Sequence, residues 1–200
     1  MPLARKEIIH ILFDRSGSLI DSWEEMVEAV NHELERYRHP QDTGNDTTIE
    51  VSITPFNDSV GETLTYVMPT EIPRFTISDW DPIGRNSFCD AMGVILEKIR
   101  TGWASERKQR EVSVYVVVFV FGCDQSSQTY SLPQVRSTIA YLEATGEWRF
   151  RFAVDDLPEM ESNAVLALRH RYANLQNKAL FKQDLMSIFF ENKDDEGPVV

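Results

Sequence analysis

Apolar residues along the chain occur either in short runs or at helical spacing. Residues 8–13 form a short, β-branched apolar run, which predicts a buried strand because central parallel strands are covered on both faces. Residues 20–38 place apolar side chains at steps of three and four, which predicts an amphipathic helix. The apolar run over residues 112–121 is the strongest strand signal in the sequence and predicts a central strand.

The remaining elements continue this alternation. Two strand-like runs, residues 49–56 and 62–68, are joined by a short polar link, which predicts an antiparallel hairpin. Further helices are predicted over residues 90–99, 132–144, 160–171 and 182–191, with a strand over residues 148–154. Alternating strands and helices predict a three-layer, Rossmann-like α/β fold, in which helices cover both faces of a mostly parallel sheet with one antiparallel edge strand. We expect a single domain over residues 1–191 and a flexible acidic tail over residues 192–200.

Composition and charge narrow the expected partners. The chain has 32 acidic and 20 basic residues and a net charge of −12. An acidic surface repels phosphate backbones, so we expect no nucleic-acid partner. The longest apolar run is too short for a membrane-spanning helix and the N-terminus lacks a signal-peptide pattern, so we expect no membrane partner. Cys89 and Cys123 fit neither a CxxC motif nor a disulfide framework, which indicates a reducing, cytoplasmic setting.

Three polar segments are predicted to meet at the carboxyl ends of the central strands, where ligands bind in open α/β sheets. The first segment holds Asp14, Ser16 and Ser18, the second holds Asn86, and the third holds Asp124. Carboxylate and hydroxyl oxygens are hard ligands that suit Mg²⁺. These segments therefore predict a cation site anchored by Asp14.

The segment that follows residue 13 also fits a plain strand-to-helix turn. Ser18 with Asp21, and Ser22 with Glu25, have the spacing of a capping box. Spacing alone favours this simpler interpretation, because the D-x-S-x-S pattern is short and consists of common turn residues.

The order of these segments resembles the von Willebrand factor A (VWA) domain family. An apolar strand that ends in Asp14, Ser16 and Ser18 is similar to the first part of that family's metal-ion-dependent adhesion site (MIDAS). Other segments resemble the second strand, the G-x-T-x-x-x-D-A helix start and the strand that ends in T-D-G; they are residues 53–58, 84–91 and 116–124. The resemblance extends over residues 8–167 and implies a sheet of about six strands.

Two positions depart from the family pattern and imply a degenerate MIDAS. Asn86 stands where the family generally has a metal-binding threonine, and Phe121 stands where it has an aspartate. An asparagine carbonyl oxygen can bind a hard cation but carries no charge, whereas Phe121 cannot ligate; Asp124 is the candidate substitute. The resemblance implies Mg²⁺, or Mn²⁺ or Ca²⁺, held by Asp14, Ser16, Ser18, Asn86 and Asp124.

The resemblance implies binding rather than catalysis. We expect a non-enzymatic protein–protein interaction module of the intracellular prokaryotic type, with a protein partner that presents an acidic residue to the metal. An alternative is a VWA scaffold whose metal site has decayed, which Phe121 supports.

A second alternative is a haloacid-dehalogenase-like phosphatase. Residues 12–19 resemble the D-x-D-G-T-L opening of that family, with Asp14 as the nucleophile, and residues 152–156 resemble its acidic motif. However, Ser16 stands in place of the second carboxylate, and a serine hydroxyl does not shuttle protons near neutral pH.

Overall fold

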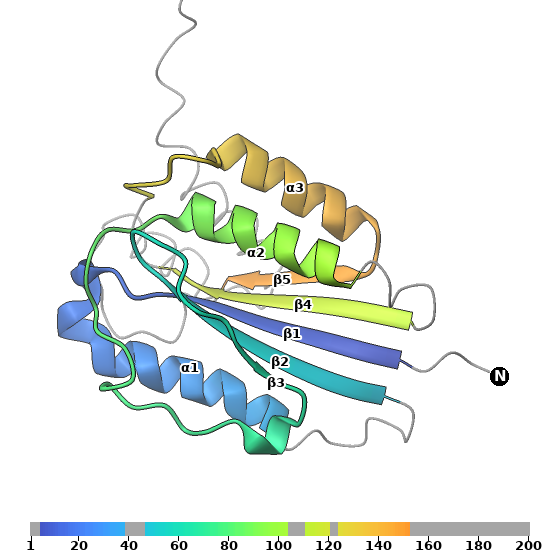
Figure 1. Ribbon diagram of the computed structural model, residues 1–200, viewed down its shortest axis with the longest axis horizontal. Coiled ribbons are helices and arrows are strands. Elements are labelled where there is room, and N and C mark those ends of the chain that lie inside the picture. The colour runs from blue at the N-terminus through green and yellow to red at the C-terminus, as the bar shows by residue number, and fades with distance from the viewer. Residues whose placement is uncertain (1–4, 39–46, 104–110, 121–123, 153–200) are drawn as a thin grey trace, which may run out of the picture. The chain divides into compact units, whose positions relative to one another are not determined.

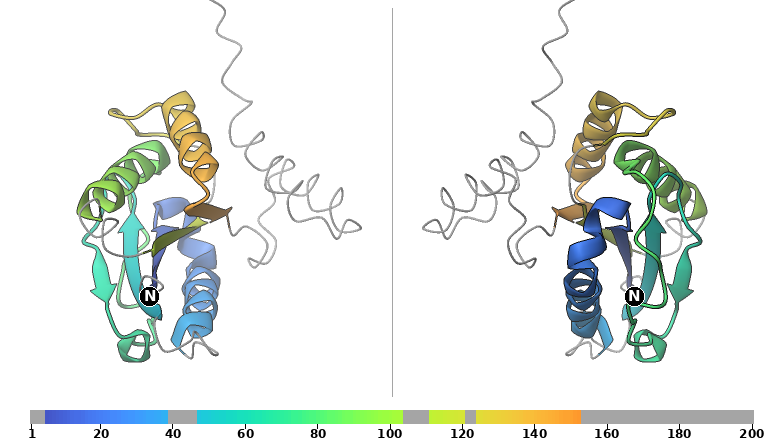
Figure 2. Two further views of the ribbon diagram at one scale, coloured as in Figure 1. Left: turned by 90° about the vertical axis from the view of Figure 1, so that its right-hand side faces the viewer. Right: turned by 90° about the vertical axis from the view of Figure 1, so that its left-hand side faces the viewer.

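The computed structural model describes residues 5–38, 47–103, 111–120 and 124–152. The elements are β1 (Arg5–Asp14), a 3₁₀ turn (Gly17–Ser22), α1 (Trp23–Arg38), β2 (Thr47–Phe56), β3 (Leu64–Tyr66), a second 3₁₀ turn (Pro69–Glu71), α2 (Phe88–Gly102), β4 (Glu111–Phe119), α3 (Leu132–Ala144) and β5 (Trp148–Phe152). They form three layers, in which α1 covers one face of the sheet while α2 and α3 cover the other (Figures 1 and 2).

The sheet has the strand order β3-β2-β1-β4-β5. Strand β1 pairs in parallel with both β2 and β4, and β4 pairs in parallel with β5. Strand β3 pairs antiparallel with β2 at the edge. The predicted α/β class, the mostly parallel sheet and the antiparallel edge strand are therefore confirmed. The described residues contain five strands, and the predicted helices after residue 153 lie outside them.

Strand β1 lacks an alternating pattern because both of its faces are covered. Phe13 packs against Trp23 of α1, with ring centroids 6.4 Å apart. On the opposite face, the Nζ atom of Lys6 lies 3.6 Å from the ring centroid of Trp103, which directly follows α2. Leu12, which precedes Phe13 in the strand, is fully buried. Hydrophobic burial on both sides of the strand explains why the sequence shows a continuous apolar run.

Three helix boundaries differ from the prediction, since α2 ends at Gly102 rather than residue 99 and two helices begin elsewhere. Helix α1 begins at Trp23 rather than residue 20, because the chain first forms a 3₁₀ turn closed by a hydrogen bond from Leu19 N to Ser16 O (3.1 Å). Helix α2 begins at Phe88 rather than residue 90, since side chains from two loops accept its first backbone N–H groups. No helix in the described part of the chain is long and apolar enough to cross a membrane.

His10 is a buried polar residue in the centre of the sheet. Its side chain is 2% exposed, and its Nε2 atom has no hydrogen-bond partner. Burial, together with the nearby charge of Lys98 on α2, lowers the pKa of His10 from 6.5 to about 3. The folded state therefore holds this imidazole neutral, because protonation would place an uncompensated charge in the core.

This burial predicts that stability falls with acidity. The unfolded chain protonates His10 below pH 6.5, whereas the folded chain does so only near pH 3, so stability is lost as the pH falls through this window. Between pH 7 and pH 5 we expect a loss of about 1–2 kcal/mol from this residue. Urea denaturation of His10→Leu should show a weaker pH dependence than the wild type. The matched variant of exposed His32 on α1, His32→Leu, should keep the wild-type dependence; equal slopes for the wild type and His10→Leu would contradict the prediction.

Candidate functional site

Asp14 ends the central strand β1 and is completely buried. Its Oδ1 atom accepts a hydrogen bond from the backbone N of Ser16 at 2.7 Å. Its Oδ2 atom accepts one from the Nδ2 atom of Asn86, also at 2.7 Å. A carboxylate removed from water needs such donors, because burying an uncompensated charge is costly. The two neighbouring loops therefore both satisfy Asp14.

Ser16 and Ser18 lie beside Asp14 at the start of the first 3₁₀ turn. Their hydroxyl oxygens are 3.1 Å apart, with Ser16 buried and Ser18 exposed. The turn is joined to the next loop by a hydrogen bond from Gly17 N to Gly84 O (2.9 Å). The structure thus brings Asp14, Ser16 and Ser18 together, and Ser18 pairs with Ser16 in this arrangement.

Asn86 contacts Asp14 through nitrogen rather than oxygen. Its Oδ1 atom accepts a hydrogen bond from the backbone N of Phe88 (2.9 Å), in the first turn of α2. Its backbone oxygen accepts hydrogen bonds from Gln125 N (2.8 Å) and from Ser126 N and Oγ (both 3.0 Å). The carbonyl end of the amide is therefore directed to the helix and the NH₂ end to the carboxylate.

Asp124 is attached to the start of α2. Its Oδ2 atom accepts a hydrogen bond from Cys89 N (2.7 Å), and its Oδ1 atom accepts one from Ser127 N (3.0 Å). Burial alone would raise the pKa of Asp124, but the hydrogen bonds from Ser127 and Cys89 outweigh it and hold the pKa below its ordinary value. The Oδ2 atom thus caps the start of α2, while the Oδ1 atom holds the loop that precedes α3. Phe121, at the position of the family's second aspartate, lies outside the described residues.

Two residues that the sequence did not single out organise the loops. Asp90 accepts hydrogen bonds from the backbone N atoms of residues 128, 129 and 130, at 2.8, 2.9 and 2.7 Å. Asn57 donates from Nδ2 to Ile83 O (2.8 Å), and its backbone oxygen accepts from Ser87 N (3.0 Å). The sequence did carry a signal for each residue. Asp90 matches the aspartate of the G-x-T-x-x-x-D-A pattern, and Asn57 is a polar residue directly after a buried strand.

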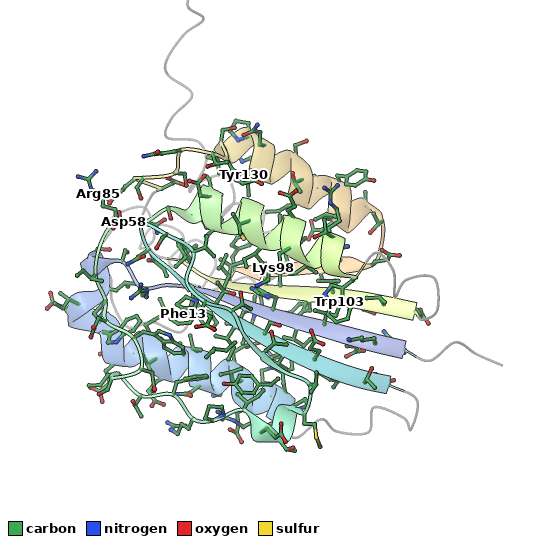
Figure 3. All side chains as sticks on the ribbon, viewed as in Figure 1. Phe13, Asp58, Arg85, Lys98, Trp103 and Tyr130 are labelled. Atoms are coloured by element: carbon green, nitrogen blue, oxygen red, sulfur yellow. The ribbon has the colours of Figure 1, made fainter. Side chains whose placement is uncertain are left out.

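A glycine lets two of these loops approach each other. Gly84 has a φ of 82°, in the left-handed region that favours glycine. A Cβ atom there would lie 2.1 Å from Oδ2 of Asp58. Figure 3 shows Asp58 and Arg85 at the carboxyl edge of the sheet, whereas Lys98 and Trp103 lie toward the other end of α2.

The groups around Asp14 are not arranged as a set of ligands for a divalent cation. The hydroxyl pair of Ser16 and Ser18 offers suitable hard oxygens. However, the amide of Asn86 presents hydrogens to Asp14, and the carboxylate of Asp124 is engaged at α2. Within the described ranges, no group of three or more His, Cys, Asp or Glu residues is placed to hold a metal ion.

The geometry also bears on the phosphatase alternative. A nucleophilic aspartate needs an accessible oxygen to attack phosphorus. Asp14 is completely buried and both oxygens accept hydrogen bonds. Residues 155 and 156, which would supply that family's acidic motif, lie outside the described residues.

Known proteins resemble the chain in structure rather than in sequence. No protein-family model matches the sequence, and no curated protein matches it significantly. One similar structure is proximal thread matrix protein 1 (PTMP1) from the mussel byssus, with 18% identity over 78% of this chain and 39% of that chain and a TM-score of 0.45. Another is manganese-loaded TRAP protein of Plasmodium vivax, with 12% identity over 75% of this chain and 57% of that chain and a TM-score of 0.43.

A third similar structure is the vWF domain of the type V pili tip protein Mfa5 from Porphyromonas gingivalis. It shares 10% identity over 61% of this chain and 39% of that chain, with a TM-score of 0.39. A further PTMP1 structure has a zinc occupied MIDAS motif. The chain spans about two fifths of the length of PTMP1. The fold is established by the sheet order and the connections given above. The function has to be argued from the residues of the site.

The attachment of Asp124 to α2 predicts a structural effect that is independent of metal. Removing the cap with Asp124→Ala should destabilise the protein by about 1–2 kcal/mol, because the N–H groups of Cys89 and Ser127 lose their acceptor. Thermal unfolding should show the same loss in EDTA and in Mg²⁺. A loss that occurs only in the presence of Mg²⁺ would instead identify Asp124 as a metal ligand.

Proposed function

We propose that this chain is a VWA-type, non-enzymatic interaction module that binds a protein partner with the loops at the carboxyl edge of its sheet. The strand order supports this location. The chain leaves β1 toward β2 on one side and later returns to β4 on the other. Ligands of open α/β sheets bind at this topological switch point, outside the carboxyl ends of the strands. Asp14 lies at this switch point, because it is the last residue of β1.

The observation that carries the proposal is that backbone hydrogen bonds fix the edge loops to one another. Arg15 N donates to Phe56 O at 2.8 Å, which joins the loop after β1 to the end of β2. Ile83 N donates to Arg15 O at 2.9 Å, which adds the loop before α2. The loop after β4 is joined to Asn86. A surface held in this way is preorganised, and a partner that binds it loses less free energy to loop ordering.

The side chains presented at this edge suit a protein partner. Ile83 is 60% exposed although it is a large apolar residue. Two charged residues near it are also exposed. Arg85 follows two positions later in the chain, and Asp58 lies against Gly84. Apolar anchors surrounded by charged groups are typical of protein interfaces. Because the Asn86 amide already satisfies Asp14, we propose that partner binding does not require a divalent cation.

A charge placed at the edge should weaken partner binding. Ile83→Glu should weaken binding at least about tenfold, as expected for loss of an apolar anchor at an interface. The matched control is Tyr141→Glu on α3, where the native side chain is 68% exposed. Proteins captured by the wild-type chain from a lysate of its own organism are identified, and the purified candidate is then titrated against each variant with and without EDTA.

The expected result is binding that survives in Tyr141→Glu and in EDTA but is at least about tenfold weaker in Ile83→Glu. Equal binding by the two variants would place the interface elsewhere and support a scaffold that assembles through another surface. Binding that EDTA abolishes would contradict the metal-independent mode.

A further inference from the structure

The side chain of Asn86 stands where a cation would be expected to meet the buried carboxylate. Its Nδ2 atom lies 2.7 Å from Oδ2 of Asp14, and both residues are buried. We propose that this amide takes the place of a divalent cation and closes the Asp14 site to metal. This inference concerns the inner part of the site and does not depend on the proposed partner.

Two N–H groups help to compensate the charge of Asp14. One oxygen accepts from Ser16 N and the other from the Asn86 amide. These hydrogens carry partial positive charge and point at carboxylate lone pairs that a hard cation, or a water bound to it, would use. A cation brought to this position would face the positive end of the amide. The same two groups therefore stabilise the carboxylate and repel the metal.

The orientation of the Asn86 amide is fixed by its second partner. The backbone N of Phe88 can only donate, and it lies 2.9 Å from the Oδ1 atom of Asn86. Rotating the amide by half a turn would put its NH₂ group against this N–H and its oxygen against the Asp14 carboxylate. Both new contacts are repulsive, and a buried donor left without an acceptor costs about 1–3 kcal/mol.

The backbone of Asn86 is held equally firmly. Its carbonyl oxygen accepts from Gln125 N, Ser126 N and Ser126 Oγ at 2.8–3.0 Å. The backbone of Asn86 therefore cannot move away from Asp14 without breaking contacts between the loops before α2 and before α3. The side-chain oxygen Oδ1, which the sequence pattern implies as a ligand, is engaged by Phe88 N. The backbone oxygen is engaged by Gln125 and Ser126.

The rest of the site keeps suitable ligands. The hydroxyl oxygens of Ser16 and Ser18, which follow Asp14 in the same loop, lie 3.1 Å apart. Replacing the amide by a carboxylate of the same shape, Asn86→Asp, would put two anionic groups within contact distance. Like charges at this separation repel strongly in a buried site, and a divalent cation relieves that repulsion while it gains a second anionic ligand.

The test compares the wild-type chain of 200 residues with Asn86→Asp and Asn86→Ser. Each is followed by thermal unfolding in EDTA and in Mn²⁺ and by calorimetric titration of Mn²⁺. The wild type should show no saturable binding and the same Tm in both conditions. Asn86→Asp should be less stable in EDTA and should gain about 5–10 °C in Tm with Mn²⁺. Asn86→Ser removes the amide without adding charge and should gain weaker but saturable binding, which decides the matter if Asn86→Asp does not fold.

Asn31 provides a matched control. It is also buried, its Nδ2 atom donates to Phe75 O at 2.8 Å, and its Oδ1 atom accepts from Phe75 N at 2.9 Å. Asn31→Asp should therefore destabilise the protein in EDTA to a similar degree, but Mn²⁺ should not restore its Tm, because no second carboxylate is bonded to Asn31.

Two results would overturn the inference. Saturable Mn²⁺ binding by the wild type that disappears in Asp14→Asn would show that the Asn86 amide does not close the site. Failure of both Asn86→Asp and Asn86→Ser to gain binding would show that something other than this amide excludes the metal.

Discussion

A carboxylate with no solvent exposure at the end of a central strand must be compensated by hydrogen bonds or by a cation, since the free energy of burying it alone is several kcal/mol. Asp14 is in that position. The compensation comes from Ser16 in its own loop and from Asn86, which is distant in sequence. The demand of one buried charge therefore brings the loops at the carboxyl edge together and sets their spacing.

The same compensation extends into α2. Asn86 joins the Asp14 carboxylate to the first turn of this helix through Phe88 N, and Asp124 caps the following N–H at Cys89. Asp90, in the first turn of the helix, holds the backbone of residues 128–130. The start of α2 is thus the structural centre of the edge. A partner that binds there meets a surface whose geometry is set from within by hydrogen bonds.

The sequence predicted the fold well because strong apolar runs determine strands that are covered on both faces. It placed β1, β2 and β4 correctly and identified the antiparallel edge strand, although β3 is shorter than the apolar run suggested. The proximity of Asp14, Ser16 and Ser18 followed from their position in one loop. The direction of the Asn86 amide could not be predicted, because an asparagine is both donor and acceptor and its orientation depends on Phe88 N. The cap formed by Asp124 depends on a contact between two loops that are distant in sequence.

The proposed role of the Asn86 amide is to satisfy Asp14 in place of a metal ion. It is tested most directly by NMR of the ¹⁵N-labelled wild-type chain during addition of the paramagnetic ion Mn²⁺. A bound Mn²⁺ broadens the signals of nearby groups, so the backbone amide of Ser16 and the side-chain amide of Asn86 report on the site. If the Asn86 amide closes the site, both signals keep their intensity in excess Mn²⁺, as does the signal of the side-chain amide of Asn31. Selective loss of the Ser16 and Asn86 signals at low Mn²⁺, with the Asn31 signal retained, would contradict it.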